Sequence, residues 1–426
     1  MRRTGKTVIQ AEMRAAALVA GLAILQVAAP SQAGEQNRVA FVTSAIGTGD
    51  LSSWAEADGG TVGAEAGDSI CRNLAAAALL ENPENFVAWI STETDDAYCR
   101  LHNLSGKKTA NCGQVELPES AGPWIRTDGT VWAPAIEELT SGDYFLYTPL
   151  DRDENGSMIL TDTVIFTATD REGTLKKSTT TCEDWTSSSS NPVGIGFTTR
   201  TIWSWAGGGT GGCQTQNRLA CIESGAGPAL PEIPPPTRPT FITSADDTGD
   251  LSSWSQADPG TEGIAAGDSV CRNLAEAAGL EGASHYRAWL SDGLTNAIDR
   301  FEVDAPWQRL DGVPIAAGKA DLTDGTLFST ITLTEQGGVI GNATAWTGTD
   351  ANGLANGGDC QDWSSSSASD MARTGSTNSV AGTWTSQSNV LCDFRSARLY
   401  CLADRPFSIF TDGFESGDTS AWSSTQ

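Results

Sequence analysis

Histidine and closely paired cysteines are scarce in this 426-residue sequence. Its only histidines are His102 and His285, and no two cysteines form a C-x-x-C pair. Zinc sites are usually built from clusters of cysteine and histidine, so a site of that kind is not expected. The sequence has no H-E-x-x-H segment, and no glycine-rich phosphate loop follows a predicted strand. These absences argue against the common zinc-dependent and nucleotide-dependent enzymes.

Long apolar runs are also missing, with one exception near the N-terminus. Ala15–Ala29 is small and apolar, follows Arg14, and is followed by Pro30-Ser31-Gln32-Ala33. A basic residue, a short apolar core and a small-x-small end are the parts of a secretory signal peptide. We therefore predict that residues 1–33 direct Sec-type export and that the protein is secreted or displayed at the cell surface. No second run is long enough to predict a membrane span.

Basic side chains are few. The chain has 26 Lys and Arg against 53 Asp and Glu, a formal net charge of −27. Removal of residues 1–33 discards four basic residues and one acidic residue, so the mature chain carries −30. Such a surface repels nucleic acid and anionic membranes and favours cations, basic protein patches or neutral glycans as partners. The alternative is that the charge serves solubility alone.

The main organisational feature is an internal repeat. Residues 38–80 align with residues 238–280 at a constant offset of 200, and 29 of these 43 positions are identical. The similarity continues to Cys221 in the first copy and Cys401 in the second. We therefore expect a domain at residues 38–224, a proline-rich linker at 225–237, a second domain at 238–404 and a tail at 405–426. Two linked copies suggest bivalent binding, and duplication without a shared ligand is the alternative.

Each copy is predicted to be a small α+β domain. We expect a helix that begins with Asp68 as its N-cap and runs to about Leu80, with Asp268 as the counterpart in the second copy. Short apolar strands and turn dipeptides follow, which predicts an antiparallel sheet. In the first copy the expected strands after the helix are Phe86–Ile90, Tyr144–Tyr147, Met158–Phe166 and Leu219–Ile222.

Ten cysteines in an exported chain predict five disulfide bonds. The copies share four cysteines each, and four cysteines allow three pairings. A nested pairing is favoured, because the first cysteine lies on the helix and the last on a terminal strand, so the outer bond joins helix to sheet. The expected pairs are Cys71–Cys221, Cys182–Cys213, Cys271–Cys401 and Cys360–Cys392, together with Cys99–Cys112, which has no counterpart in the second copy.

The order of these features resembles a known fold. A helix that carries a cysteine precedes Ala88-Trp89-Ile90-Ser91, and Cys360-Gln361-Asp362-Trp363 precedes the last two cysteines. This order is similar to that of the C-type lectin-like fold and of endostatin. It is most similar to bacterial endostatin-like domains, as in leptospiral outer-surface proteins implicated in binding host matrix proteins. The resemblance covers nearly all of residues 38–223 and 238–403, and it implies two tandem lectin-fold domains with a role in extracellular recognition.

The sequence departs from better-known members of this fold at their binding sites. The Glu-Pro-Asn, Gln-Pro-Asp and Trp-Asn-Asp triplets typical of calcium-dependent sugar binding do not occur between the middle cysteines. The zinc-binding histidines of endostatin and its basic heparin surface have no counterparts either. The resemblance therefore implies a fold and an extracellular role without naming a ligand.

One segment of the first copy matches the spacing of a calcium-binding loop. Asp151, Asp153, Asn155 and Asp162 place oxygen atoms at positions 1, 3, 5 and 12, and Gly156 stands at position 6. The flanks are predicted strands, and Asp replaces the usual Glu at position 12. A plain Asn-Gly hairpin turn is the favoured alternative. Calcium is the one cofactor that the sequence suggests.

The first copy also has about 17 extra residues between Trp89 and Trp124, compared with Trp289 to Trp307. This insertion is predicted to form a loop pinned by its own disulfide bond. The loop is either a binding element specific to the first copy or a tolerated surface insertion.

Tryptophans near the middle cysteines allow two interpretations. Asp184-Trp185 and Asp362-Trp363 each follow a cysteine directly, and Trp203, Trp205 and Trp384 lie in the loops that follow. Exposed rings beside carboxylates would form a platform for sugars. Buried rings packed on a disulfide bond are the favoured interpretation.

These points together predict a function. A Ser/His/Asp site needs a histidine that the fold can place, and His102 and His285 occupy non-equivalent positions in the two copies. We therefore predict a non-catalytic recognition protein that binds an extracellular protein or glycan through two lectin-fold domains. The alternative is a structural, envelope-associated protein whose repeats mediate self-association.

Overall fold

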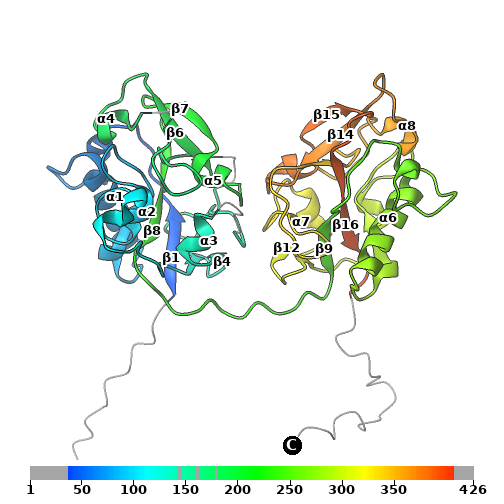
Figure 1. The fold of residues 1–426 in the computed structure, drawn as a ribbon, viewed down its shortest axis with the longest axis horizontal. Helices are drawn as coiled ribbons and strands as arrows, with labels where there is room; N and C mark the ends of the chain where they lie inside the picture. The colour runs from blue at the N-terminus through cyan, green and yellow to red at the C-terminus, as the bar shows by residue number, and fades with distance from the viewer. Residues whose placement is uncertain (1–36, 142–145, 160–162, 178–179, 407–426) are drawn as a thin grey trace, which may run out of the picture. The chain divides into compact units, whose positions relative to one another are not determined.

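The computed structural model describes residues 37–141, 146–159, 163–177 and 180–406. The predicted signal peptide, Asp162 and most of the C-terminal tail lie outside these residues. Within them, the chain forms two mixed α and β units, one from each repeat (Figure 1). No helix in the described ranges is long and apolar enough to cross a membrane. Residues 227–236, within the predicted linker, form neither helix nor strand.

Each repeat contains one eight-stranded sheet, and the two sheets have the same strand order. In the first the order is β4-β3-β1-β8-β5-β6-β7, and β2 pairs with β8 as well. The strands of the first sheet are β1 (Arg38–Val42), β2 (Phe86–Ala88), β3 (Trp124–Arg126), β4 (Val131–Ala133), β5 (Val164–Phe166), β6 (Pro192–Phe197), β7 (Gly209–Gly212) and β8 (Arg218–Glu223). Those of the second are β9 (Pro239–Ile242), β10 (Tyr286–Ala288), β11 (Trp307–Arg309), β12 (Pro314–Ala316), β13 (Thr344–Trp346), β14 (Met371–Ser376), β15 (Ser388–Leu391) and β16 (Ala397–Ala403).

The sheets are mixed, so the expectation of antiparallel sheets was wrong in part. β1 runs parallel to β3 and β5 runs parallel to β8, whereas β1 and β8 are antiparallel. The second sheet repeats this pattern with β9, β11, β13 and β16. Parallel neighbours need a long crossover connection, which the chain between β1 and β3 provides. Short apolar strands look alike in sequence whichever way they pair, so the strand pattern did not show this.

The long helix of each repeat begins earlier than predicted. α1 spans Gly63–Ala77 and α6 spans Gly263–Ala277. Asp68 and Asp268 therefore lie inside these helices and not at their N-caps. Their side chains do not cap the helix but accept hydrogen bonds from the backbone N of Ala88 and Ala288 on the sheet. The shorter α-helices are α2 (Ala97–Leu101), α3 (Ile136–Leu139), α4 (Cys182–Trp185), α5 (Ser204–Gly207), α7 (Lys319–Thr323) and α8 (Cys360–Trp363). The 3-10 helices are η1 (Leu51–Ser53), η2 (Pro83–Asn85), η3 (Lys108–Gly113), η4 (Leu251–Ser253), η5 (Ala283–His285), η6 (Ile298–Arg300) and η7 (Gly382–Trp384).

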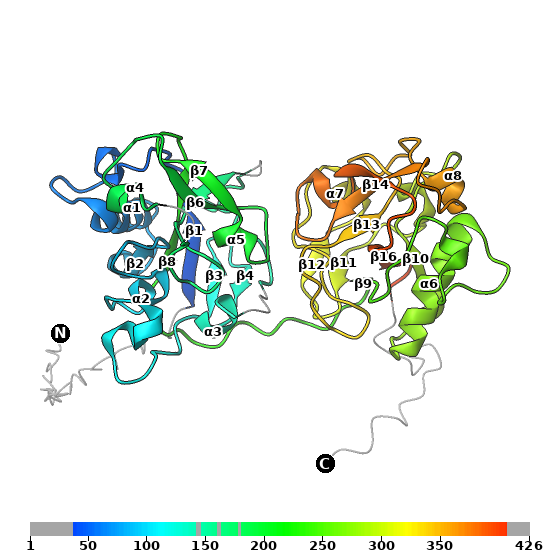
Figure 2. The same cartoon turned by 45° about the horizontal axis from the view of Figure 1, so that its top comes forward.

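Each sheet is buried on both faces. On the first sheet, alternate residues of β8 point to opposite sides, because successive side chains of a strand alternate. Leu219 packs in the core that contains α1, and Ile222 packs in the core that contains residues of α3 and α5. Figure 2 shows α1 on one side of β1 and β8 and α5 on the other. The cores of the second repeat are divided in the same way.

Five disulfide bonds join the ten cysteines in the nested pairs favoured from the sequence. Cys71 on α1 is bonded to Cys221 on β8 across 150 residues of chain, and Cys271 is bonded to Cys401 in the same way. A disulfide bond that closes a loop of this length lowers the conformational entropy of the unfolded chain. Each outer bond therefore adds up to about 5 kcal/mol to the free energy of unfolding.

The short helix α4 is a left-handed turn. Four consecutive residues without glycine, Cys182 to Trp185, have φ values of 53°, 55°, 53° and 66°. In α8 the corresponding values are 51°, 56°, 53° and 63°. Each such residue costs about 1–2 kcal/mol, so the turn persists only if other contacts hold it. The disulfide bond to Cys213 is one of these contacts, and the fully buried ring of Trp185 is another.

Asp184 supplies the remaining contacts of this turn. Its Oδ1 accepts a hydrogen bond from the Glu93 backbone N at 2.8 Å, and its own backbone N donates to Thr181 Oγ1 at 3.0 Å. Its carbonyl oxygen lies so close to Gly63 that a Cβ on that glycine would be 2.7 Å away. The Cys-x-Asp-Trp segment therefore fastens the start of α1 to the sheet, and α8 does the same at Gly263.

The Gly63→Ala variant tests this close approach. Gly63 has a φ of 60°, so alanine would be strained and would also meet the Asp184 carbonyl oxygen. We expect the free energy of unfolding, measured by urea titration, to fall by about 2–3 kcal/mol. Gly59→Ala is the control, since no atom lies within 4 Å of its added Cβ. Equal effects of the two substitutions would contradict the proposed fastening.

Candidate functional site

A buried ion pair lies between the long helix and the sheet in both repeats. In the first, Arg100 of α2 donates from Nη2 to Asp68 Oδ1 at 2.6 Å, and the Ala88 backbone N donates to the same oxygen at 2.9 Å. The pair thus links α1, β2 and α2. Neither carboxylate was recognised in the sequence as part of an ion pair. The signal that was available is the recurrence of Arg100 as Arg300 at the same offset of 200.

In the second repeat the corresponding ion pair engages both oxygens of the carboxylate. Arg300 donates from Nη2 to both carboxylate oxygens of Asp268, at 2.6 Å each, and from Nη1 to the Ala288 carbonyl oxygen. In the first repeat only Oδ1 of Asp68 is engaged, and no described residue donates a hydrogen bond to Oδ2. The first repeat therefore keeps a free acceptor on a carboxylate that is only 8% exposed.

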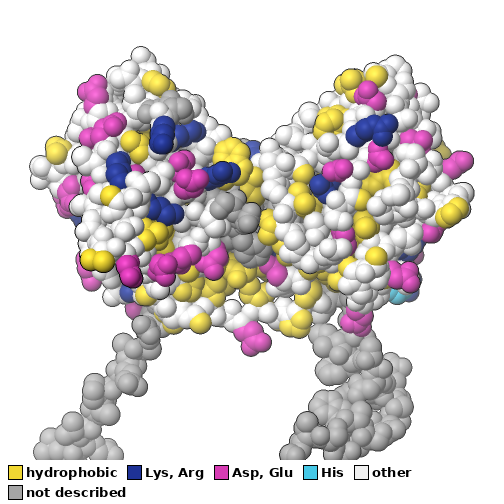
Figure 3. Space-filling view, viewed as in Figure 1, with side chains coloured by type: hydrophobic (Ala, Val, Ile, Leu, Met, Phe, Trp, Pro, Cys, Tyr) yellow, Lys and Arg dark blue, Asp and Glu magenta, His cyan; other side chains and the backbone are white. Residues whose placement is uncertain are grey.

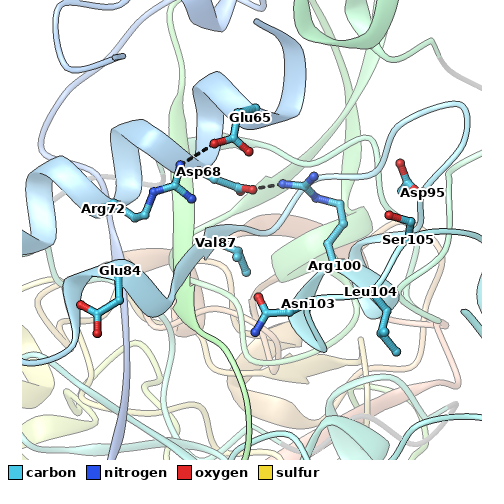
Figure 4. A pocket seen from close by; sticks show the side chains of 10 residues that line it. All are labelled: Glu65, Asp68, Arg72, Glu84, Val87, Asp95, Arg100, Asn103, Leu104 and Ser105. Carbon is cyan, nitrogen blue, oxygen red and sulfur yellow. Dashed lines mark hydrogen bonds and ion pairs between the residues drawn. The ribbon is translucent and has the colours of Figure 1, made fainter. Parts of the chain in front are cut away.

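A pocket of about 320 Å³ opens beside this pair in the first repeat. Figure 4 shows Arg100 reaching toward Asp68 on α1, where Arg72 is paired with Glu65. The pocket is lined by Glu65, Asp68 and Arg72 of α1, Glu84 of η2, Val87 of β2, Asp95, Arg100 of α2, and Asn103, Leu104 and Ser105. Four carboxylates face two guanidinium groups, so the lining has a formal net charge of −2.

The insertion forms one wall of the pocket through Asn103, Leu104 and Ser105. Asp95 holds the beginning of this segment, since its Oδ1 accepts a hydrogen bond from the Gly106 backbone N. The disulfide bond between Cys99 and Cys112 closes a loop of 13 residues around it. Of the two interpretations left open by the sequence, the pocket favours a binding element.

The lysines of the insertion face the body of the domain and not the solvent. Lys107 Nζ donates to the Thr92 carbonyl oxygen at 2.9 Å and lies 3.3 Å from Asp96 Oδ1. Lys108 Nζ lies 4.2 Å from the centroid of the Tyr98 ring. These contacts hold the insertion against the domain.

Burial raises the pKa of the Asp68 carboxyl, and the nearby Arg100 guanidinium acts in the opposite direction. Burial is the larger effect, because a single contact with Arg100 replaces only part of the water that the carboxylate loses.

The segment proposed as a calcium loop is a hairpin. Arg152 and Met158 form a β-bridge across it, as Leu333 and Val339 do at the matching place in the second repeat. Asp153 Oδ1 accepts hydrogen bonds from the backbone N of Asn155 and Ser157, at 2.9 and 2.8 Å. The hairpin interpretation is therefore confirmed.

Asp151 is unsuited to bind a cation. Its Oδ1 accepts from Arg126 at 2.6 Å and from Arg152 at 2.7 Å, so two guanidinium groups already neutralise it. The described residues contain no group of three or more His, Cys, Asp or Glu side chains that could hold a metal ion. The calcium interpretation of Asp151, Asp153, Asn155 and Asp162 is therefore weakened at Asp151, and it stays a prediction because Asp162 lies outside the described residues.

The tryptophan platform is likewise set aside. Trp185, Trp205, Trp363 and Trp384 are each at most 1% exposed, and Trp185 Nε1 donates to the Ser91 carbonyl oxygen. Of the tryptophans considered, Trp203 alone is exposed, at 38%. The favoured interpretation is confirmed for Trp185 and Trp363, which share their cores with disulfide-bonded cysteines. Trp205 and Trp384 are also buried, but they pack against Trp89 and Trp289.

Comparison of the chain with protein-family models and with curated proteins found no match.

Removal of the Cys99–Cys112 bond tests the role of the insertion as a wall. In the Cys99→Ala/Cys112→Ala variant we expect the free energy of unfolding to fall by up to about 3 kcal/mol, because the 13-residue loop is no longer closed. Amide hydrogen exchange should accelerate at residues 102–113 and stay unchanged in α6. Unchanged exchange in the insertion would show that its other contacts hold the wall in place without the disulfide bond, and it would contradict this prediction.

The Asp68→Asn variant tests the raised pKa of Asp68. The carboxyl of Asp68 has a pKa of about 4 in the unfolded chain, and a higher pKa in the folded protein. Protonation then stabilises the folded state at pH values below about 4, and this stabilisation is lost as the pH rises through the folded-state pKa. Asparagine does not titrate, so the stability of the wild type relative to the variant should decline as the pH rises above about 4. Urea titrations from pH 3.5 to 7 measure this difference, and a difference independent of pH would contradict the shift.

Proposed function

We propose that the protein is a non-catalytic recognition protein that binds an extracellular protein or glycan through two tandem domains of the C-type lectin-like, endostatin-like kind. The observation that carries the proposal is the pocket of the first repeat. It lies on a framework that both repeats share, and its wall belongs to an insertion that the second repeat lacks.

Several features of the framework support this proposal. Both repeats contain the ion pair, the left-handed turn and the nested disulfide bonds. These features hold the long helix, which carries three of the pocket side chains, against the sheet. Rigid placement favours binding, since little conformational entropy is then lost when a ligand is captured. The order of cysteines and tryptophans supports the endostatin-like assignment, and the five disulfide bonds support an extracellular location.

The acidic surface bears on the partner. Figure 3 shows acidic side chains spread over one face of each repeat, with Lys and Arg between them. With a net charge of −27 over the chain, partners with basic surfaces are attracted at long range.

The proposal is tested by exposing the purified protein to arrays of extracellular matrix proteins and glycans. We expect reproducible binding of a small set of ligands by the wild type and a loss of at least about tenfold in the Cys99→Ala/Cys112→Ala variant, which loosens the pocket wall. Binding of no ligand, together with concentration-dependent assembly in light scattering, would favour a structural, self-associating protein instead.

A further inference from the structure

We propose that the pocket of the first repeat takes a single organic cation, the ammonium or guanidinium group of a lysine or arginine side chain on a protein partner. This inference rests on the proposed function and narrows its ligand from protein or glycan to a protein with an exposed basic side chain. The same place carries different charges in the two repeats.

The second repeat lacks the charge that would attract a cation. At the positions of Glu65, Glu84 and Asp95 it has Ala265, Ser284 and Thr295, and Arg287 replaces Val87. One carboxylate, Asp268, then remains with three arginines, Arg272, Arg287 and Arg300. With Asp404, the partner of Arg287, the formal charge at this place is +1 in the second repeat and −2 in the first.

Arg287 also has a charged partner in the second repeat. Arg287 forms an ion pair there with Asp404, with Nε and Nη2 each 3.0 Å from Oδ2. The corresponding residues in the first repeat are Val87 and Ser224, and Ser224 Oγ accepts a hydrogen bond from Asn103 of the insertion at 3.0 Å. The second repeat thus has an internal ion pair at two positions that are uncharged in the first.

The free acceptors of the pocket suit a cation. Asp68 is 8% exposed, and its Oδ2 accepts no hydrogen bond from the described residues. Glu84 has an exposed side chain with no ion pair or hydrogen bond in the described part of the chain. An entering ammonium group would supply the donors that both carboxylates lack, and charge-assisted hydrogen bonds of this kind are strong.

The lining favours an organic cation over the other candidates. A volume of about 320 Å³ is far more than a metal ion needs. No aromatic side chain lines the pocket, so a sugar ring would have no surface on which to stack. The aliphatic stem of a lysine side chain can instead lie against Val87 and Leu104 while its charged end meets the carboxylates.

The experiment uses Nα-acetyl-L-lysine methylamide as the probe and the norleucine analogue, which lacks only the charge, as its control. Ligand-observed NMR with the full chain measures both dissociation constants. We expect the lysine probe to bind at least about fivefold more tightly than the norleucine probe, and this preference to fall as salt is added. Equal binding of the two probes would overturn the inference.

Two variants locate the binding. Glu84→Gln should weaken binding of the lysine probe at least threefold, whereas Glu81→Gln, an equal change of charge on an exposed residue of the same loop, should not. Val87→Arg with Ser224→Asp recreates the ion pair of the second repeat and should abolish binding. Thermal unfolding establishes that each variant is folded. Equal effects of Glu84→Gln and Glu81→Gln would show that the probe responds only to the overall charge, and the inference would be rejected.

The outcomes separate this inference from the proposed function. If the arrays yield a ligand whose binding is unaffected by Glu84→Gln, the cation pocket is rejected and the recognition function stands. If the lysine probe binds as expected and the arrays yield no ligand, the pocket stands and the recognition function is rejected.

Discussion

The bond between Cys71 and Cys221 is the constraint on which each repeat depends, together with its counterpart between Cys271 and Cys401. It fastens the single long helix to β8, the strand that pairs with β1, β2 and β5. The strands are only three to seven residues long, so each makes few backbone hydrogen bonds within the sheet. Most of the other helices are a single turn. A domain of this construction has little regular structure to nucleate it, so a covalent bond that limits the unfolded chain is a large part of its stability.

The left-handed turns show how this stability is used. A run of four residues with positive φ is unfavourable by itself, and it recurs in both repeats because a disulfide bond, a buried tryptophan and two hydrogen bonds of an aspartate all hold it. In return the turn positions the start of the long helix. The same helix then presents Asp68 or Asp268 to an arginine from the next short helical segment. Helix, turn and ion pair therefore act as one framework.

The two repeats use this framework differently. In the second, the arginine satisfies both oxygens of its aspartate, and a further ion pair joins Arg287 to Asp404. In the first, an aspartate oxygen remains free, valine and serine replace the second ion pair, and a disulfide-closed insertion encloses the space. Removal of one partner of a buried ion pair is strongly destabilising, because it leaves the other charge buried without compensation. Both repeats have the pair, although the residues around it differ.

Much of this protein follows from the sequence alone. The repeat follows because identical residues at a fixed offset fold alike. The nested pairing was favoured among three because the first shared cysteine lies on the helix and the last on a terminal strand, and the structure has this pairing. Other features were decided by tertiary structure. The start of α1 was misplaced because Asp68, a good capping residue locally, has its partners on the sheet and on α2. Strand direction was missed because short apolar strands do not encode it. The calcium-like spacing at Asp151 did not show that Arg126, distant in the sequence, and the neighbouring Arg152 both pair with the Asp151 carboxylate. The pocket itself arises from residues on six separate segments, and only their meeting in space gives it its charge and its open acceptors.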